Sequence, residues 1–188
     1  MNYITVQQIR HFSQFGWIEF EPFFSLEECA KILQFLRDTV HFRLDKDPNL
    51  LPWEQLYQAS RDCWRDQDGL KQIYTNRKLR SPAEQLTEKK RLLLVCDQWI
   101  PAEASFDPLN LSAHLSYQGL ICACLIALEG EETGRVRFLH PERLPLFSGS
   151  QLLIAYGTTQ TVYVHNPKDP SNSYLKQFGY NFGDRLAK

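Results

Sequence analysis

The fold class is decided by the longest apolar run of the chain, Leu120-Ile121-Cys122-Ala123-Cys124-Leu125-Ile126-Ala127-Leu128. The run is about half as long as a membrane-spanning helix must be. Turn signals follow it at Glu129-Gly130 and Thr133-Gly134. Side chains alternate between the two faces of a strand, so the even-numbered residues of the run should share one face and the odd-numbered residues the other. Both sets are apolar, and we therefore expect a central strand that is buried on both sides.

Shorter β patterns surround this run, all of them after Arg91. Apolar alternation or short apolar runs predict strands at 92–100, 135–138, 152–156, 161–165 and 174–182. Residues up to about 90 carry helical patterns instead. Helices followed by many strands are typical of an α+β domain. We expect an antiparallel barrel or sandwich with N-terminal helices packed outside it.

Capping residues mark two helix starts in the N-terminal half. Thr5 is the expected N-cap of a helix that ends at Gly16. Ser25 and Glu28 form a capping box, which predicts a second helix that continues to Val40. Further elements expected here are a short strand at 17–20 closed by Pro22, loops with short helices at 43–68, and helical segments at 70–86 broken at Pro82.

Length and composition fit one domain over residues 1–188. Apolar residues make up 43% of the chain and charged residues 23%, which is enough to build a sizeable core. The net charge of −1 gives no overall field that would attract nucleic acid or an anionic membrane. The first residues lack the pattern of a secretory signal, so we expect a cytoplasmic protein.

Cysteine usage agrees with that compartment. The chain has 5 cysteines and no CxxC motif, so we expect no disulfide framework. Cys122 and Cys124 would lie on one face of a strand, where a soft-metal site is the alternative to core packing. Core packing is favoured because no histidine or third cysteine stands next to them.

The order of motifs in the N-terminal half resembles the opening of phytanoyl-CoA-dioxygenase-like proteins. The matching segments are 5–9 with Phe12, Gly16-Trp17-Ile18, the capped segment 23–29, Arg61-Asp62-Cys63-Trp64-Arg65 and 92–97. The resemblance implies the double-stranded β-helix, or jelly-roll, of Fe(II)/2-oxoglutarate-dependent oxygenases. The independent β pattern of the second half agrees with that fold. The chain is short for the family, so we expect its connecting loops to be short.

The resemblance also implies an iron site made of a His-x-Asp/Glu pair and a distal histidine, with open positions for 2-oxoglutarate and oxygen. It places His114 at the first ligand position and Ser116 where the carboxylate should be. A neutral hydroxyl is a poor ligand for Fe(II). Counting along the family pattern puts Gln160 or Thr161 at the distal position. His165 comes four or five residues later, roughly 13–17 Å along an extended strand.

A loop at 157–159 could absorb that offset. His165 would then be the distal ligand, and Lys176 would stand near the basic position that holds 2-oxoglutarate. Ser116 would still be unexplained. Because two of the three ligand positions are lost, we favour a degenerate iron site and a non-catalytic binding or regulatory role. The alternative is an active Fe(II)/2-oxoglutarate oxygenase that uses His114 and His165, either a hydroxylase or a halogenase.

A further alternative is a regulator that binds nucleic acid or protein. Basic clusters at 77–80 and 89–91 would suit phosphate contacts. A solvated helical face explains the same clusters, so nucleic acid is not the expected partner. A small-molecule ligand stays open, and we expect no membrane partner. The other histidines, expected on the surface or in a loop, are His11, His41 and His140.

Overall fold

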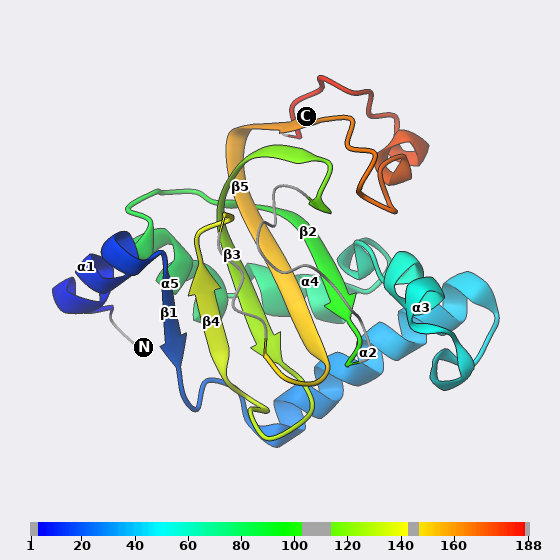
Figure 1. Cartoon of the computed structure of the whole chain (residues 1–188), viewed down its shortest axis with the longest axis horizontal. Helices are drawn as coiled ribbons and strands as arrows, with labels where there is room; N and C mark the ends of the chain where they lie inside the picture. Colours follow the sequence, from blue (N-terminus) through cyan, green and yellow to red (C-terminus); the bar gives the residue numbers. More distant parts are fainter. Residues whose placement is uncertain (1–3, 103–113, 143–146, 187–188) are drawn as a thin grey trace.

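The computed structural model describes residues 4–102, 114–142 and 147–186. Its helices are α1 (Val6–Phe15), α2 (Leu26–Leu44), α3 (Trp53–Ala59), α4 (Asp68–Thr75) and α5 (Arg77–Leu86), with 3-10 turns η1 (Pro48–Leu50), η2 (Cys63–Arg65) and η3 (Tyr174–Phe178). Its strands are β1 (Trp17–Phe20), β2 (Leu93–Ile100), β3 (Tyr117–Ala127), β4 (Val136–Leu139) and β5 (Gln151–Tyr163). The described strands form one antiparallel sheet in the order β1-β4-β3-β5-β2, and α2, α4 and α5 lie behind it in Figure 1.

Both predicted helix starts are confirmed. Thr5 Oγ1 accepts a hydrogen bond from Gln8 N at 3.2 Å, and Ser25 Oγ accepts one from Glu28 N at 3.1 Å. In each box the third helical residue returns a side-chain bond to the cap, which satisfies a second exposed amide. Gly16 ends α1 with a φ of 76°, a conformation that glycine adopts without steric strain. The expected strand at 17–20 is β1.

The break between the helical segments at 70–86 lies at Asn76, and the prediction of a break at Pro82 was wrong. Asn76 has an extended backbone, and its Oδ1 accepts a hydrogen bond from Lys78 N at 3.0 Å, so it caps α5. Pro82 lies inside α5 and is buried. The helix continues through the proline because one of its faces packs into the core at Leu79, Ala83 and Leu86.

The central apolar run forms β3, which is the middle strand of the sheet and is buried on both faces. One face packs against the helices, and the other belongs to a second core cluster with Tyr57 of α3 and Leu175 of η3. The predicted alternation holds from Cys122 onward but was wrong before it. A register shift between Leu120 and Cys122 puts Leu120 with the second cluster and Ile121 with the helix-side core.

The strands predicted at 152–156 and 161–165 are a single strand, β5, which ends at Tyr163. No loop separates them. Leu120 pairs with Gly157 and Gln118 pairs with Val162, so the four residues 158–161 lie opposite the single residue Gly119. The extra residues form a bulge within the strand.

The strand predicted at 174–182 was also wrong, because residues 174–178 form the 3-10 turn η3. Leu175 is the buried residue of this turn, and the rings of Tyr174 and Phe178 pack 5.5 Å apart. Gly179 then reverses the chain with a φ of 81°. The C-terminal segment returns to the end of β5, as Figure 1 shows, where Tyr163 N donates to Asp184 O at 2.9 Å. Among the described residues, no helix has the length and apolar character of a membrane span.

Candidate functional site

A buried ion pair joins distant parts of the chain near the start of β3. Arg61 Nη2 lies 3.0 Å from Asp169 Oδ1, and each side chain is only 1% exposed. Asp169 Oδ2 also accepts a hydrogen bond from Ser116 N at 2.8 Å. On the other side, Arg61 Nε donates to Gln98 Oε1 on β2 at 2.8 Å. Burial alone lowers the pKa of Arg61, but the facing Asp169 carboxylate raises it above its ordinary value, so the guanidinium stays charged.

Ser116, at the expected carboxylate position, is part of this network. It is 1% exposed, and its Oγ donates to Asn172 Oδ1 at 3.0 Å. The same Asn172 oxygen accepts a bond from Asn166 N at 2.7 Å, and Asn172 Nδ2 lies 3.0 Å from Nδ1 of His165. Ser116 therefore anchors the segment after β5 with both its backbone and its hydroxyl group.

The structure brings the backbones near His114 and His165 together. Val164 N donates to Ser116 O at 3.0 Å, and Asn166 Nδ2 donates to Leu115 O at 3.0 Å. His114 is half-buried, whereas His165 is exposed.

Lys176 and His165 both contact the aromatic ring of Phe182. The Lys176 Nζ is 4.4 Å from the centroid of the Phe182 ring, and the His165 ring is 5.1 Å from the same centroid. Lys176 itself is exposed on η3.

The other two residues at expected distal-ligand positions, Gln160 and Thr161, lie in the bulge of β5. Gln160 is exposed. Thr161 is buried, and its Oγ1 accepts a bond from Thr158 N and donates one to Gly119 O, each at 2.9 Å. Thr161 therefore ties the bulge to β3.

The donors at this position do not fit the three-ligand iron site that the resemblance implies. Within 4–102, 114–142 and 147–186, no three His, Cys, Asp or Glu side chains come together as a metal-binding group. The carboxylate that contacts Ser116, Asp169, is paired with Arg61. The Ser116 hydroxyl and one His165 nitrogen both contact Asn172.

A second group of buried acids lies between η2 and β2. Asp97 is 0% exposed, and its Oδ2 accepts a hydrogen bond from Tyr74 Oη at 3.0 Å. Its Oδ1 has no hydrogen-bond partner among the described residues. Burial, with the neighbouring Asp62 as the next cause, raises the pKa of Asp97 to about 8. Burial also raises the pKa of Asp62, although Arg65 and Arg61 oppose this shift.

Sequence reasoning missed Asp169 and Asn172 and cited Arg61 only for its place in a motif order. The available signal was local: residues 166–172 are rich in Asn, Asp, Ser and Pro, a composition typical of turns whose side chains bond the backbone. It could indicate the turn, in which Asp169 Oδ1 accepts from Ser171 N at 2.9 Å, but not the contacts with residues on other elements.

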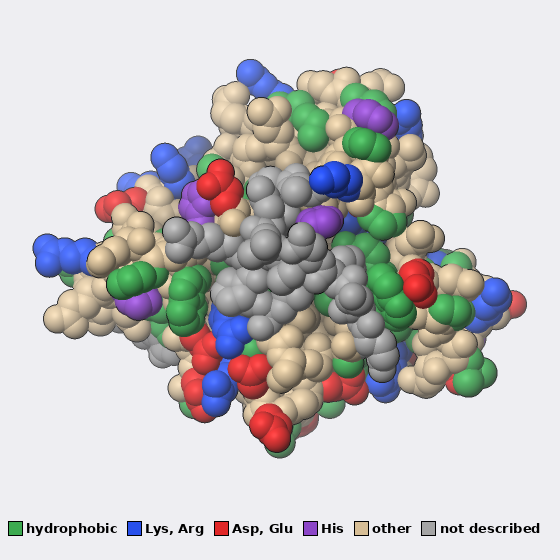
Figure 2. Space-filling model, in the orientation of Figure 1, with side chains coloured by type: hydrophobic (Ala, Val, Ile, Leu, Met, Phe, Trp, Pro, Cys, Tyr) green, Lys and Arg blue, Asp and Glu red, His purple; other side chains and the backbone are tan. Residues whose placement is uncertain are grey.

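The basic cluster at 77–80 is largely paired. Lys78 Nζ lies 2.7 Å from Glu28 Oε1, and Arg80 Nε lies 2.9 Å from Glu84 Oε1. Residues 89–91 are exposed. On the described part of the face in Figure 2, basic and acidic side chains are interspersed. The solvated-face interpretation of these clusters agrees with this distribution.

The two cysteines of β3 belong to the core. Cys122 and Cys124 are both 0% exposed and pack on the helix side. Burial raises the pKa of the Cys122 thiol to about 12, so it stays protonated. All 5 cysteines are buried and free.

Comparison with known proteins gives a fold but no sequence family. No family model matches the chain, and no curated protein matches it. Among solved structures, CT296 from Chlamydia trachomatis matches with a TM-score of 0.60 and 18% identity, over 84% of this chain and 97% of that one.

Two enzymes of nogalamycin biosynthesis match over nearly the whole chain. The non-haem alpha-ketoglutarate-dependent carbocyclase SnoK has a TM-score of 0.67 and 11% identity, over 98% of this chain and 94% of that one. The epimerase SnoN, solved with Fe3+, alpha-ketoglutarate and nogalamycin RO, has a TM-score of 0.64 and 11% identity, over 97% and 95%. The chain therefore shares the fold of these solved structures.

Proposed function

We propose that this chain uses the fold of the 2-oxoglutarate-dependent oxygenases without their iron chemistry, as a binding or regulatory protein. The observation that carries the proposal is the bonding of Ser116. Its amide and hydroxyl groups hold Asp169 and Asn172, so the position of the expected carboxylate ligand has become a structural contact. A metal ligand needs a free lone pair aimed at an open site, whereas the Ser116 hydroxyl and one nitrogen of His165 are both engaged with Asn172.

We further infer that the strands belong to a double-stranded β-helix of the phytanoyl-CoA dioxygenase-like type. The similarity to SnoK and SnoN supports the fold. The path of β5 agrees with it, because this strand runs past the bulge and pairs again with residues 184–186, with Leu186 N donating to Thr161 O at 3.0 Å. The branch within the superfamily stays a prediction, as does a cytoplasmic location.

An active oxygenase is the second candidate, and one observation favours it. The pairing of 164–166 with 115–116 places His165 close to the segment that carries His114, and Lys176 contacts the Phe182 ring that His165 also contacts. If the network opened, these two histidines would be the residues to hold Fe(II), and Lys176 the residue to hold 2-oxoglutarate.

Metal and cosubstrate titration separates the two candidates. The metal-free protein is titrated anaerobically with Fe(II) and then with 2-oxoglutarate in a calorimeter, and its melting temperature is measured with and without Mn(II). We expect no heat of binding and no change in melting temperature. Binding would be detected as a rise in melting temperature, because a ligand that binds only the folded state must stabilise it.

Histidine variants show which residues are responsible for any change in melting temperature with Mn(II). A rise in melting temperature with Mn(II) that is lost in both His114→Ala and His165→Ala, but kept in His11→Ala on α1, would overturn the proposal and establish the iron site. His11 is the matched control because it is an exposed histidine far from the network in the sequence.

A further inference from the structure

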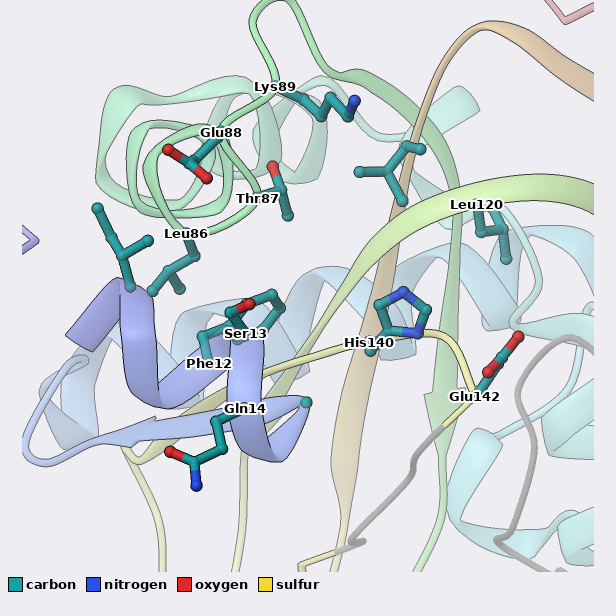
Figure 3. Close-up of a pocket in the computed structure, with 13 residues that line it drawn as sticks. Phe12, Ser13, Gln14, Leu86, Thr87, Glu88, Lys89, Leu120, His140 and Glu142 are labelled. Carbon is teal, nitrogen blue, oxygen red and sulfur yellow. The ribbon is translucent and has the colours of Figure 1, made fainter. Parts of the chain in front are cut away.

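A cavity of about 470 Å³ lies between α1, the end of α5 and the start of β3 (Figure 3). This volume falls in the range of small-molecule pockets, about 300–1,000 Å³. None of the residues of the Arg61–Asp169–Ser116 network lines it. Its apolar lining comes from three elements and consists of Ile9, Phe12, Leu86, Leu120 and Ile121.

The cavity exists because β3 is longer than its neighbour. β4 pairs with β3 only from Ala123 to Ile126. Before Ala123, no described strand pairs with the edge of β3 that faces β4. The bulge at this point places Ile121 on the helix side together with Cys122 and leaves Leu120 on the other face, and both Leu120 and Ile121 stay half-buried at the cavity. An apolar strand edge is thus left open beside an apolar helix face.

Charges of both signs stand at the rim. Lys89, His140 and Glu142 all line the cavity, and none of their side chains has a hydrogen bond or ion pair within the described residues. In Figure 3, Lys89 and Glu142 lie at opposite ends of the side on which Leu120 lies, with His140 between them. His140 N donates to Gly16 O at 2.7 Å, which holds this histidine at the rim. Glu88 turns towards the other side in the same view.

We propose that the cavity binds a short apolar zwitterion of the size and chemistry of a dipeptide such as L-leucyl-L-leucine. The carboxylate pairs with Lys89, the ammonium group pairs with Glu142, and the apolar side chains lie on the lining contributed by Phe12, Leu86 and Ile121. A molecule with separated charges of both signs suits a rim that offers both signs, whereas a purely anionic amphiphile would meet Glu142 and Glu88. The inference deepens the proposed binding role and rests on it.

Calorimetric titration of the full chain with L-leucyl-L-leucine tests the assignment. We expect saturable binding that weakens about threefold in Lys89→Met and in Glu142→Gln, the size of effect typical of exposed charge pairs. Lys90→Met and Glu131→Gln are the matched controls, because both residues are exposed and neither lines the cavity. Both controls should bind as the unchanged protein does.

Dipeptides with one end capped identify which charged group of the ligand each residue binds. The C-terminal amide of the dipeptide should bind equally to the unchanged protein and to Lys89→Met, and the N-acetyl form equally to the unchanged protein and to Glu142→Gln. No saturable binding, or equal binding of the free and capped forms by every variant, would overturn the inference. The metal titration with the His114 and His165 variants reports on a different site, so failure of this inference can be distinguished from failure of the proposed function.

Discussion

Asp97 is a carboxyl group held out of water beside a second buried acid, Asp62. Tyr74 donates one hydrogen bond to it, and no cation pairs with it among the described residues. Folding therefore favours the protonated acid, because an ionised carboxylate without water or a counter-ion is costly to bury. A single residue thus makes the stability of the whole domain depend on pH.

The sign of that dependence follows from the raised pKa. Asp97 has a pKa of about 8 in the folded chain and of about 4 when unfolded. Its contribution to stability is complete below pH 4 and is lost as pH rises through 8. The free energy of unfolding should fall by up to about 1.4 kcal/mol for each pH unit in this range. Asp97→Asn should remove this slope.

Urea unfolding at pH 5, 6, 7 and 8 checks the prediction. The stability of the Asp97→Asn variant relative to the unchanged protein should increase steadily with pH. Glu131→Gln is the control, because this carboxylate is exposed and its removal should leave the slope unchanged. Parallel pH profiles for the unchanged protein and Asp97→Asn would show that Asp97 is ionised in the fold.

At the scale of elements, the bulge in β5 explains the position of His165. The four residues 158–161 take up length in the strand while β3 advances by only Gly119. Gly119 has a φ of 82°, and Thr161 bonds its carbonyl group. The strand therefore reaches the level of Ser116 later in the sequence than a regular strand would.

Thr161→Val tests how much the bulge depends on one hydroxyl group. The substitution keeps the shape but leaves Thr158 N and Gly119 O without their partner, so we expect a loss of about 1–3 kcal/mol in the free energy of unfolding. Thr159→Val, at an exposed position of the same bulge, should change stability by less than about 0.5 kcal/mol. Equal effects of the two variants would show that the hydroxyl contacts of Thr161 contribute little.

At the scale of the whole molecule, the Arg61–Asp169 pair connects the two halves of the chain. Arg61 follows α3 and faces Gln98 on β2, and Asp169 lies in the segment after β5. Arg43 of α2 makes a related connection, because its Nη2 donates to Tyr174 Oη at 2.9 Å. The helical half and the C-terminal segment are thus held together by buried and half-buried polar contacts.

Removing one member of this pair should destabilise the whole domain. Asp169→Asn leaves the Arg61 charge buried without its counter-ion, and we expect a loss of about 3–5 kcal/mol. Glu129→Gln breaks an exposed pair with Arg37 and should cost less than about 1 kcal/mol. Chemical denaturation measures both. A loss below 1 kcal/mol for Asp169→Asn would mean that water reaches Arg61 and replaces the carboxylate.

The parts of the fold that local signals encode could be predicted. The caps at Thr5 and Ser25 act through bonds to residues three positions away, and the apolar run that forms β3 shows its burial in its own composition. The break at Asn76 and the turn η3 were missed. Asn76 was overlooked beside the stronger signal of Pro82, and the aromatic pattern at 174–182 suits a 3-10 turn that buries Leu175 as well as it suits a strand.

The sequence by itself determined that this protein has helices followed by strands and a central strand that is buried on both sides. Only the tertiary structure decided what Ser116 does and where His165 lies. The partners of Ser116 are Asp169 and Asn172, which stand 53 and 56 positions away in the sequence. Their approach to Ser116 depends on the bulge and on the return of the chain after β5. Local propensities reach a few residues along the chain, whereas a buried polar network is selected by the packing of segments that meet only in the folded molecule.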